Sequence, residues 1–208
     1  MPRSSLCGWT LKAAELSEPL VKLLGKKIIE NDYAQADETR VQILDEVGRP
    51  NTIQSYMWVY RGGEKQPSIV FDYQETRGGY HAQRFLSGFK GYLQTDAYSG
   101  YNWTNDKDEV IPVGCHAHAR RSFAELAKLS EASGLSVDAL KFYRKLYAIE
   151  KEARENNLSP EERFKLRQNK APPILDAFKK WLDHHLTKTP EQGKIGKAIR
   201  YCLGHWTE

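Results

Sequence analysis

The apolar residues of the first thirty positions recur at the intervals of a helix face. Pro19 falls inside this pattern, and because proline interrupts the backbone hydrogen bonds of a helix, we expect a short helix followed by a second one. Three runs rich in β-branched and aromatic residues come next, at 36–44, 56–60 and 68–73, with glycine or proline between them. Such runs predict three consecutive strands joined by turns.

The period of the pattern changes after Gly78-Gly79. From 80 to 89 the apolar residues have the spacing of a helix face. Two short runs, 91–96 and 109–114, predict a fourth and a fifth strand, and Pro112 favours an edge position for the fifth. Three strands, a helix and two further strands predict an α/β fold with a mixed five-stranded sheet covered by helices.

Beyond Ala119 the pattern is helical to the end of the chain. Ser136 is placed to cap one helix, and the capping box Ser159-Pro160-Glu161-Glu162 starts another. Pro172-Pro173 predicts a break before the apolar pattern resumes.

The composition is that of an ordinary globular protein. Of the 208 residues 40% are hydrophobic and 28% charged, and no apolar run approaches the length of about 20 that spans a bilayer. The N-terminus lacks the apolar core of a signal peptide, so we expect a cytoplasmic protein with no membrane partner. Three widely spaced cysteines predict no disulfide framework. The net charge of +4 permits contact with nucleic acid but is equally typical of a solvated surface.

Two aspartates occupy predicted strand positions, although aspartate is uncommon in strands. Asp37 lies at the start of the first predicted strand and Asp96 at the end of the fourth. If these strands are neighbours, the carboxylates converge, and a divalent cation such as Mg²⁺ relieves their repulsion. Such a pair can activate water for attack on a phosphodiester. Spacing alone leaves open the alternative that both are turn or edge residues.

Four strings occur in a characteristic order. They are Ala36-Asp37-Glu38-Thr39, then Val70-Phe71-Asp72-Tyr73-Gln74 followed by Arg77-Gly78-Gly79, then 91–102 and 114–123. Together they closely resemble the central domain of insertion-sequence-66-type bacterial transposases, and the similarity extends through the helical tail.

The resemblance implies a fold and a chemistry. The fold is a ribonuclease-H-like core at 31–130, with an N-terminal helical segment at 1–30 and an all-helical insertion at 131–208. In the family an Asp-Asp-Glu triad binds Mg²⁺ or Mn²⁺, and by motif matching Asp37 and Asp96 are its first two acids. The third, a glutamate on a later helix, has no counterpart, because Glu208 stands in the wrong context. We therefore expect a chain truncated at both ends.

Two further acids lie close to these motifs. Glu38 points to the opposite face of its strand from Asp37, so we treat it as accessory. Asp72 either lies near the catalytic edge or simply closes the third strand.

The helix after the fifth strand begins with two kinds of candidate ligand. Cys115-His116-Ala117-His118 invites a zinc interpretation, but its ligands are too close together for a usual finger and lack a second pair. With the resemblance, His118, Arg120 and Arg121 are expected to bind DNA, because guanidinium groups bind phosphate with two hydrogen bonds. The alternative is ordinary solvated charge on a helix.

Two functions follow as hypotheses. The first is a transposase catalytic-domain segment for metal-dependent DNA cleavage and strand transfer at insertion-sequence ends, inactive alone because the third acid is missing. Its partners are transposon-end and target DNA and a second copy or a complementing transposase chain, in a nucleoid-associated protein of the prokaryotic cytoplasm. The second hypothesis is a non-catalytic DNA-binding or oligomerising remnant of a truncated transposase.

Overall fold

The computed structural model describes residues 2–63, 67–96, 98–129 and 134–207. The chain divides into two compact units, Met1–Gly114 and Cys115–Glu208, and each is described by itself. No helix in the described ranges is both long and apolar enough to cross a membrane.

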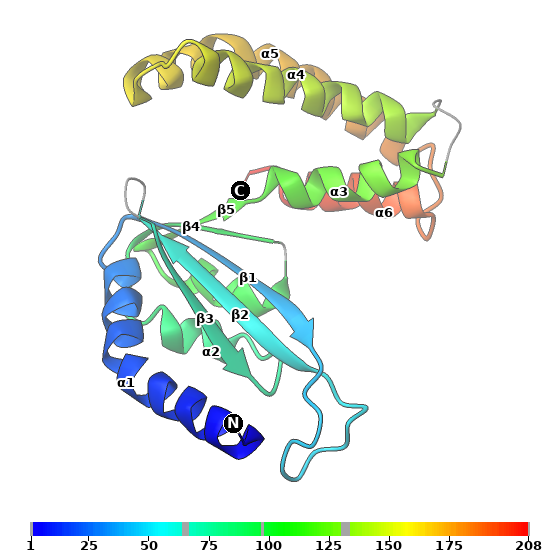
Figure 1. The fold of residues 1–208 in the computed structure, drawn as a ribbon. Helices are drawn as coiled ribbons and strands as arrows, with labels where there is room; N and C mark the ends of the chain where they lie inside the picture. Colours follow the sequence, from blue (N-terminus) through cyan, green and yellow to red (C-terminus); the bar gives the residue numbers. More distant parts are fainter. Residues whose placement is uncertain (1, 64–66, 97, 130–133, 208) are drawn as a thin grey trace. The chain divides into compact units, whose positions relative to one another are not determined.

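The first unit is built on a five-stranded sheet of order β3-β2-β1-β4-β5 (Figure 1). β1 to β3 form an antiparallel meander, and β4 pairs in parallel with both β1 and β5. The predicted mixed α/β sheet is confirmed, and so is the edge position of its fifth strand. In chain order the elements are α1 (Arg3–Ile29), β1 (Tyr33–Val41), β2 (Ser55–Gly62), β3 (Ser68–Gln74), α2 (Tyr80–Phe85), β4 (Gly91–Thr95), the 3₁₀ helix η1 (Ser99–Asp106) and β5 (Val110–Gly114).

One face of this sheet carries the core. The strand register sets Ala36, Tyr60 and Val70 side by side, and all three are buried together with Ile28 of α1 and Leu86 after α2. Because side chains alternate along a strand, the next row on the same face is that of Glu38, Trp58 and Asp72. Glu38 therefore points toward the core side, and Asp37 points to the other face.

The second unit is helical in its described residues, apart from turns. Its helices are α3 (His116–Ala127), α4 (Leu135–Glu155), α5 (Pro160–Leu186) and α6 (Lys194–Gly204). Each contributes to one buried cluster, which includes Phe123, Tyr143, Phe178 and Ile199. The predicted capping box is confirmed: the Ser159 hydroxyl accepts from the Glu162 N–H, and the Glu162 carboxylate accepts from the Ser159 N–H.

Three local predictions are wrong. α1 continues through Pro19, where we expected two helices, and α5 continues through Pro172 and Pro173. A proline inside a helix removes one hydrogen bond and bends the helix, and Figure 1 shows α1 changing direction along its length. Ser136 caps nothing, because α4 already begins at Leu135 and Ser136 is buried inside its first turn.

Candidate functional site

β1 carries Asp37, and β4 ends one residue before Asp96. The two strands are parallel neighbours in the sheet. Their register pairs Ala34 with Leu93 and Gln35 with Gln94. The ladder ends at this pair; extended by two residues, the same register would set Asp37 level with Asp96, which directly follows β4. Gln35 donates a hydrogen bond of 2.5 Å to the side-chain oxygen of Gln94, on the face to which Asp37 also belongs.

A backbone N–H holds one oxygen of each aspartate. Oδ1 of Asp37, which is exposed, accepts from the N–H of Glu38 at 2.9 Å. Oδ1 of Asp96 accepts from the N–H of Tyr98 at 3.0 Å. Such local hydrogen bonds fix the orientation of a carboxylate. Carboxylate oxygens are the donors that Mg²⁺ prefers, and it commonly uses one or two of them together with substrate phosphate. The chemistry of these two groups therefore fits such an ion.

Among the residues that the structure describes, no third acid joins the pair to make a larger metal-binding cluster. Within the described residues, no group of three or more His, Cys, Asp or Glu side chains could hold a metal ion. The same finding applies to Cys115, His116 and His118, and it gives the zinc interpretation no support.

Glu38 lies at the centre of a buried network that the sequence did not reveal. Only 1% of its side chain is exposed. Arg77 donates from Nε to Oε1 at 2.8 Å, its Nη2 lies 2.6 Å from the same oxygen as an ion pair, and the Tyr101 hydroxyl donates to Oε2 at 3.0 Å. Burial raises the pKa of Glu38, although the hydrogen bonds from Arg77 and Tyr101 lower it. The charge of Asp96 adds to the increase, so the Asp96 carboxylate is within electrostatic range of Glu38.

Arg77 also contacts the segment that follows Asp96. Its guanidinium carbon lies 3.8 Å from the centre of the Tyr98 ring, and the Tyr98 hydroxyl donates to the Arg77 carbonyl oxygen at 2.5 Å. Stacking of a guanidinium on an aromatic face is a favourable cation–π contact. The network thus joins β1, the segment before α2 and the segment after β4.

The residues expected to bind DNA lie on α3, in the second unit. Arg121 is exposed, whereas His118 and Arg120 are half-buried. The Arg120 guanidinium lies 5.9 Å from the centre of the Tyr147 ring, so Arg120 has a packing contact inside the helical unit. Arg121 is therefore the more accessible of the two arginines.

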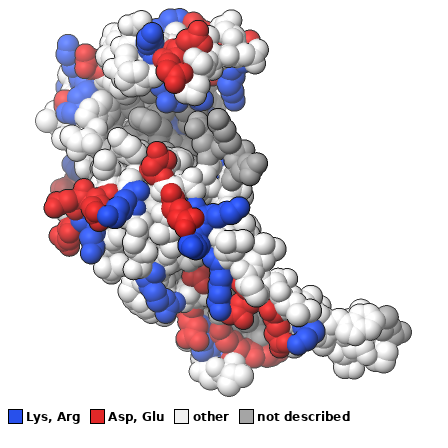
Figure 2. Space-filling view, turned by 90° about the vertical axis from the view of Figure 1, so that its left-hand side faces the viewer, with Lys and Arg blue, Asp and Glu red and all other residues white. Residues whose placement is uncertain are grey.

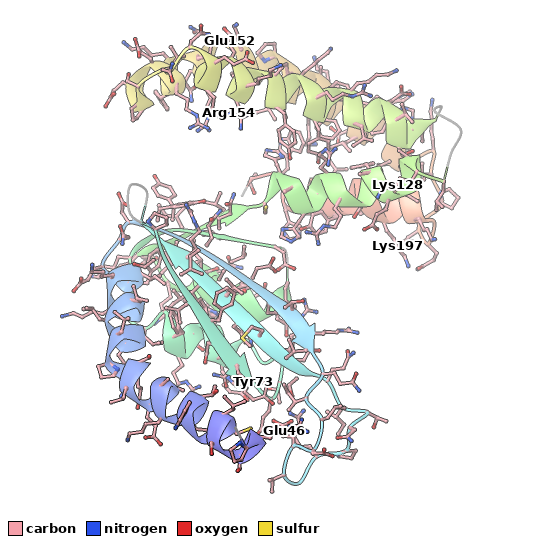
Figure 3. The ribbon with its side chains drawn as sticks, in the orientation of Figure 1. Glu46, Tyr73, Lys128, Glu152, Arg154 and Lys197 are labelled. Atoms are coloured by element: carbon pink, nitrogen blue, oxygen red, sulfur yellow. The ribbon has the colours of Figure 1, made fainter. Side chains whose placement is uncertain are left out.

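Positive and negative side chains are interspersed on the face shown in Figure 2. Several of the cations in the helical unit are paired with acids across helices. Lys170 of α5 lies 2.7 Å from Glu152 of α4, which is labelled in Figure 3, and Arg167 lies 2.6 Å from Glu150. Net charge alone therefore does not define a nucleic-acid surface.

The whole chain, residues 1–208, matches the family model described as Transposase IS66 family. The chain belongs to the IS66 family of transposases. Three proteins of Sinorhizobium fredii, each named an uncharacterized protein, are among the relatives of this IS66-family chain. It is 30% identical to y4jD over 100% of its own length, and 28% identical to y4hP and y4qI over 90% and 97%. It spans only 42%, 37% and 39% of the length of those relatives, in that order.

The members of the Glu38 network lie in the motif strings of this IS66-family chain. Three of the four strings supply its members: Glu38 from the first, Arg77 from the second, and Tyr98 and Tyr101 from the third. The alternation of side chains along the strand could have indicated this network. Glu38 lies on the same face as Ala34 and Ala36, which are buried, and a buried acid requires a partner of opposite charge.

Proposed function

We propose that this chain is the catalytic-domain segment of an IS66-family transposase and acts in metal-dependent cleavage and strand transfer of DNA at transposon ends. The observation that supports the proposal is the parallel pairing of β1 with β4, whose last pair, Gln35 with Gln94, lies two residues before Asp37 and Asp96. We further propose that the mixed five-stranded sheet is the ribonuclease-H-like core that membership of the family suggests.

In this proposal Asp37 and Asp96 hold Mg²⁺ or Mn²⁺. An ion bound by these residues would supply polarisation of the scissile phosphate and activation of the attacking hydroxyl. The chain's own contribution is to orient both carboxylates through the N–H groups of Glu38 and Tyr98. Because no third acid joins the pair among the described residues, we expect the isolated chain to cleave DNA poorly or not at all.

Isothermal titration with Mn²⁺ tests this proposal without requiring turnover. We expect the 208-residue chain to bind Mn²⁺, and we expect Asp37→Asn and Asp96→Asn each to weaken binding by about tenfold or more, because each removes one charged ligand. Asp108→Asn, which changes an exposed acid in a turn of the same unit, is the matched control. Equal binding by all four proteins would overturn the proposal.

DNA is the proposed partner, and α3 is the proposed contact. Arg121, with Arg120 and His118, is suited to phosphate oxygens because guanidinium and imidazolium groups donate hydrogen bonds and carry positive charge. This contact requires no metal ion, so it can be tested separately from the aspartate pair.

One observation favours the second candidate function, an oligomerising role. The side chains at positions 6, 9, 13, 16, 20 and 23 of α1 follow the alternating three and four spacing of a heptad seam. The leucines and the tryptophan of this α1 stripe are 50–71% exposed. The acids nearest its middle lie off the seam, where Glu15 pairs with Lys12 and Glu18 with Lys22 on the same helix.

We propose that this stripe packs against α1 of a second copy of the chain. A heptad spacing lets two identical helices pack together, which a surface of mixed polar residues does not. Sedimentation equilibrium tests the proposal. The unmodified chain is expected to dimerise with rising concentration, Leu16→Asn is expected to be monomeric, and the off-seam control Lys22→Gln is expected to dimerise. A wild-type chain that stays monomeric would remove this candidate and leave the catalytic proposal standing.

A further inference from the structure

We propose that the Glu38 network is a clamp that positions Asp96. The inference rests on the proposed function, in which Asp96 is a cation ligand. The members of the clamp are Glu38, Arg77, Tyr98 and Tyr101. They are positioning residues, since none is proposed to contact the cation or the substrate.

The clamp has a fixed end in the sheet. Glu38 belongs to β1 and is paired with Trp58 of β2, and its side chain is almost fully buried. Two hydrogen bonds reach this carboxylate, one from Arg77 Nε and one from the Tyr101 hydroxyl, and Arg77 Nη2 completes an ion pair with it at 2.6 Å. A buried carboxylate that is hydrogen-bonded by a cation holds its partners more strongly than a neutral acceptor does. Arg77 and Tyr101 are therefore fixed relative to β1, the strand that also carries Asp37.

The other end of the clamp lies on both sides of Asp96. On the preceding side, the Thr95 hydroxyl donates to the Asp96 carbonyl oxygen at 2.8 Å. On the following side, the Tyr98 N–H donates to Oδ1 of Asp96, and the Tyr101 N–H donates to the Tyr98 carbonyl oxygen at 3.0 Å. Tyr98 and Tyr101 are the residues that Arg77 and Glu38 hold, so the clamp fixes the hydrogen-bond partner of the Asp96 carboxylate.

This arrangement has a functional consequence. Asp96 lies outside β4, so the ladder of the sheet does not fix its position as it fixes that of Asp37. A cation shared by two carboxylates requires both to be held at a defined separation. The clamp fixes the position of Asp96, as the hydrogen bonds of β1 fix the position of Asp37.

Tyr101→Phe tests the clamp, because it removes one hydroxyl and keeps the ring that fills the core. Tyr73→Phe is the matched control. The Tyr73 hydroxyl also donates to a glutamate, Glu46, but that pair lies outside the clamp (Figure 3). Hydrogen exchange of the Tyr98 amide, followed by NMR, reports on the segment after Asp96 without any metal. Titration with Mn²⁺ reports on the proposed cation site.

For Tyr101→Phe we expect Tyr98 amide exchange to accelerate by about tenfold, the scale of losing one hydrogen bond to a charged group. Exchange in the core of β2 should stay unchanged, and Mn²⁺ affinity should fall several-fold. Tyr73→Phe should change neither quantity. Equal acceleration in β2 and at Tyr98 would mean a merely structural role and would overturn the inference, as would unchanged exchange at Tyr98.

Arg77→Gln separates positioning from charge. Loss of a positive charge near Asp96 should tighten Mn²⁺ binding if Arg77 acts only electrostatically, whereas loss of the clamp should weaken it. Tighter binding by Arg77→Gln therefore contradicts the clamp. If the unmodified chain binds no Mn²⁺ while Tyr101→Phe still accelerates Tyr98 exchange alone, the proposed function fails and the positioning of this segment by the clamp is supported.

Discussion

Gly79 and Gly100 meet backbone to backbone. A Cβ atom on Gly79 would lie 2.0 Å from the carbonyl oxygen of Gly100, and backbone cannot swing aside as the end of a side chain can. Gly79 follows Arg77 by two residues and Gly100 precedes Tyr101, so this contact joins the two segments that hold Glu38. The contact explains in physical terms why position 79 is glycine, whereas a Cβ atom on Gly100 would lie 2.2 Å from the ring of Tyr98.

Gly79→Ala is therefore expected to destabilise the first unit by about 1–3 kcal/mol, the usual cost of overpacking a site that cannot relax. Urea denaturation measures this change. Gly8→Ala is the control, because a methyl group there has nothing within 4 Å. Since Gly8 lies inside α1, its replacement by alanine should stabilise the helix by up to about 1 kcal/mol. Equal stability of Gly79→Ala and the unmodified chain would contradict the close contact.

Much of the fold could be predicted from the sequence, because strand and helix periods differ and the turns carry glycine. The sequence also indicated that β5 is an edge strand, since Pro112 cannot donate to a neighbour. The continuity of α1 and α5 could not be predicted, because whether a helix tolerates proline depends on the packing around it. The aspartate pair followed from motif order, and its role stays a prediction. The clamp was missed because its bonds join residues 39 and 63 positions apart.

The pH dependence of stability should reveal the buried state of Glu38. Burial raises its pKa above the usual 4.5, so its favourable contribution is present below that pH and is lost as the pH rises through the raised value. We expect Glu38→Gln to lose less stability than the unmodified chain as the pH increases from 4.5. Urea denaturation at a series of pH values checks this.

Glu46→Gln provides a comparison of opposite sign. The Tyr73 hydrogen bond, with Arg49 and Ser55, lowers the pKa of Glu46. Its contribution is therefore present above the usual pKa and is lost as the pH falls. Parallel pH profiles for Glu38→Gln and Glu46→Gln would contradict the assignment of Glu38 as a buried acid.

Glu150 should make the helical unit sensitive to acid. Hydrogen bonds from Arg167 and then Arg163 lower its pKa to about 2, so its contribution is complete above the usual pKa of 4.5 and is lost between that value and about 2. Because the arginines are partly exposed, we expect a contribution of only about 0–1 kcal/mol. The free energy of unfolding of Glu150→Gln should be lower than that of the unmodified chain at neutral pH, and the two values should converge near pH 2. Constant separation of the two denaturation curves across this range would contradict the ion pair.

Salt dependence should identify the phosphate contacts on α3. If Arg121 contacts a phosphate, Arg121→Gln should weaken duplex DNA binding and reduce the slope of log affinity against log salt by about 1. Fluorescence anisotropy over a salt series measures the slope. The control is Arg154→Gln on α4, an exposed arginine labelled in Figure 3. DNA binding should persist in Asp37→Asn and Asp96→Asn, and an unchanged slope for Arg121→Gln would exclude the contact.

The most direct measurement of the central proposal locates the cation itself. Substoichiometric Mn²⁺ added to ¹⁵N-labelled chain broadens the amide signals of residues close to the bound ion. We predict selective broadening at residues 36–38 of β1 and at Asp96 and Tyr98 after β4, with loss of this effect in Asp37→Asn. Broadening centred elsewhere, or confined to only one of these two segments, would contradict a cation held jointly by Asp37 and Asp96.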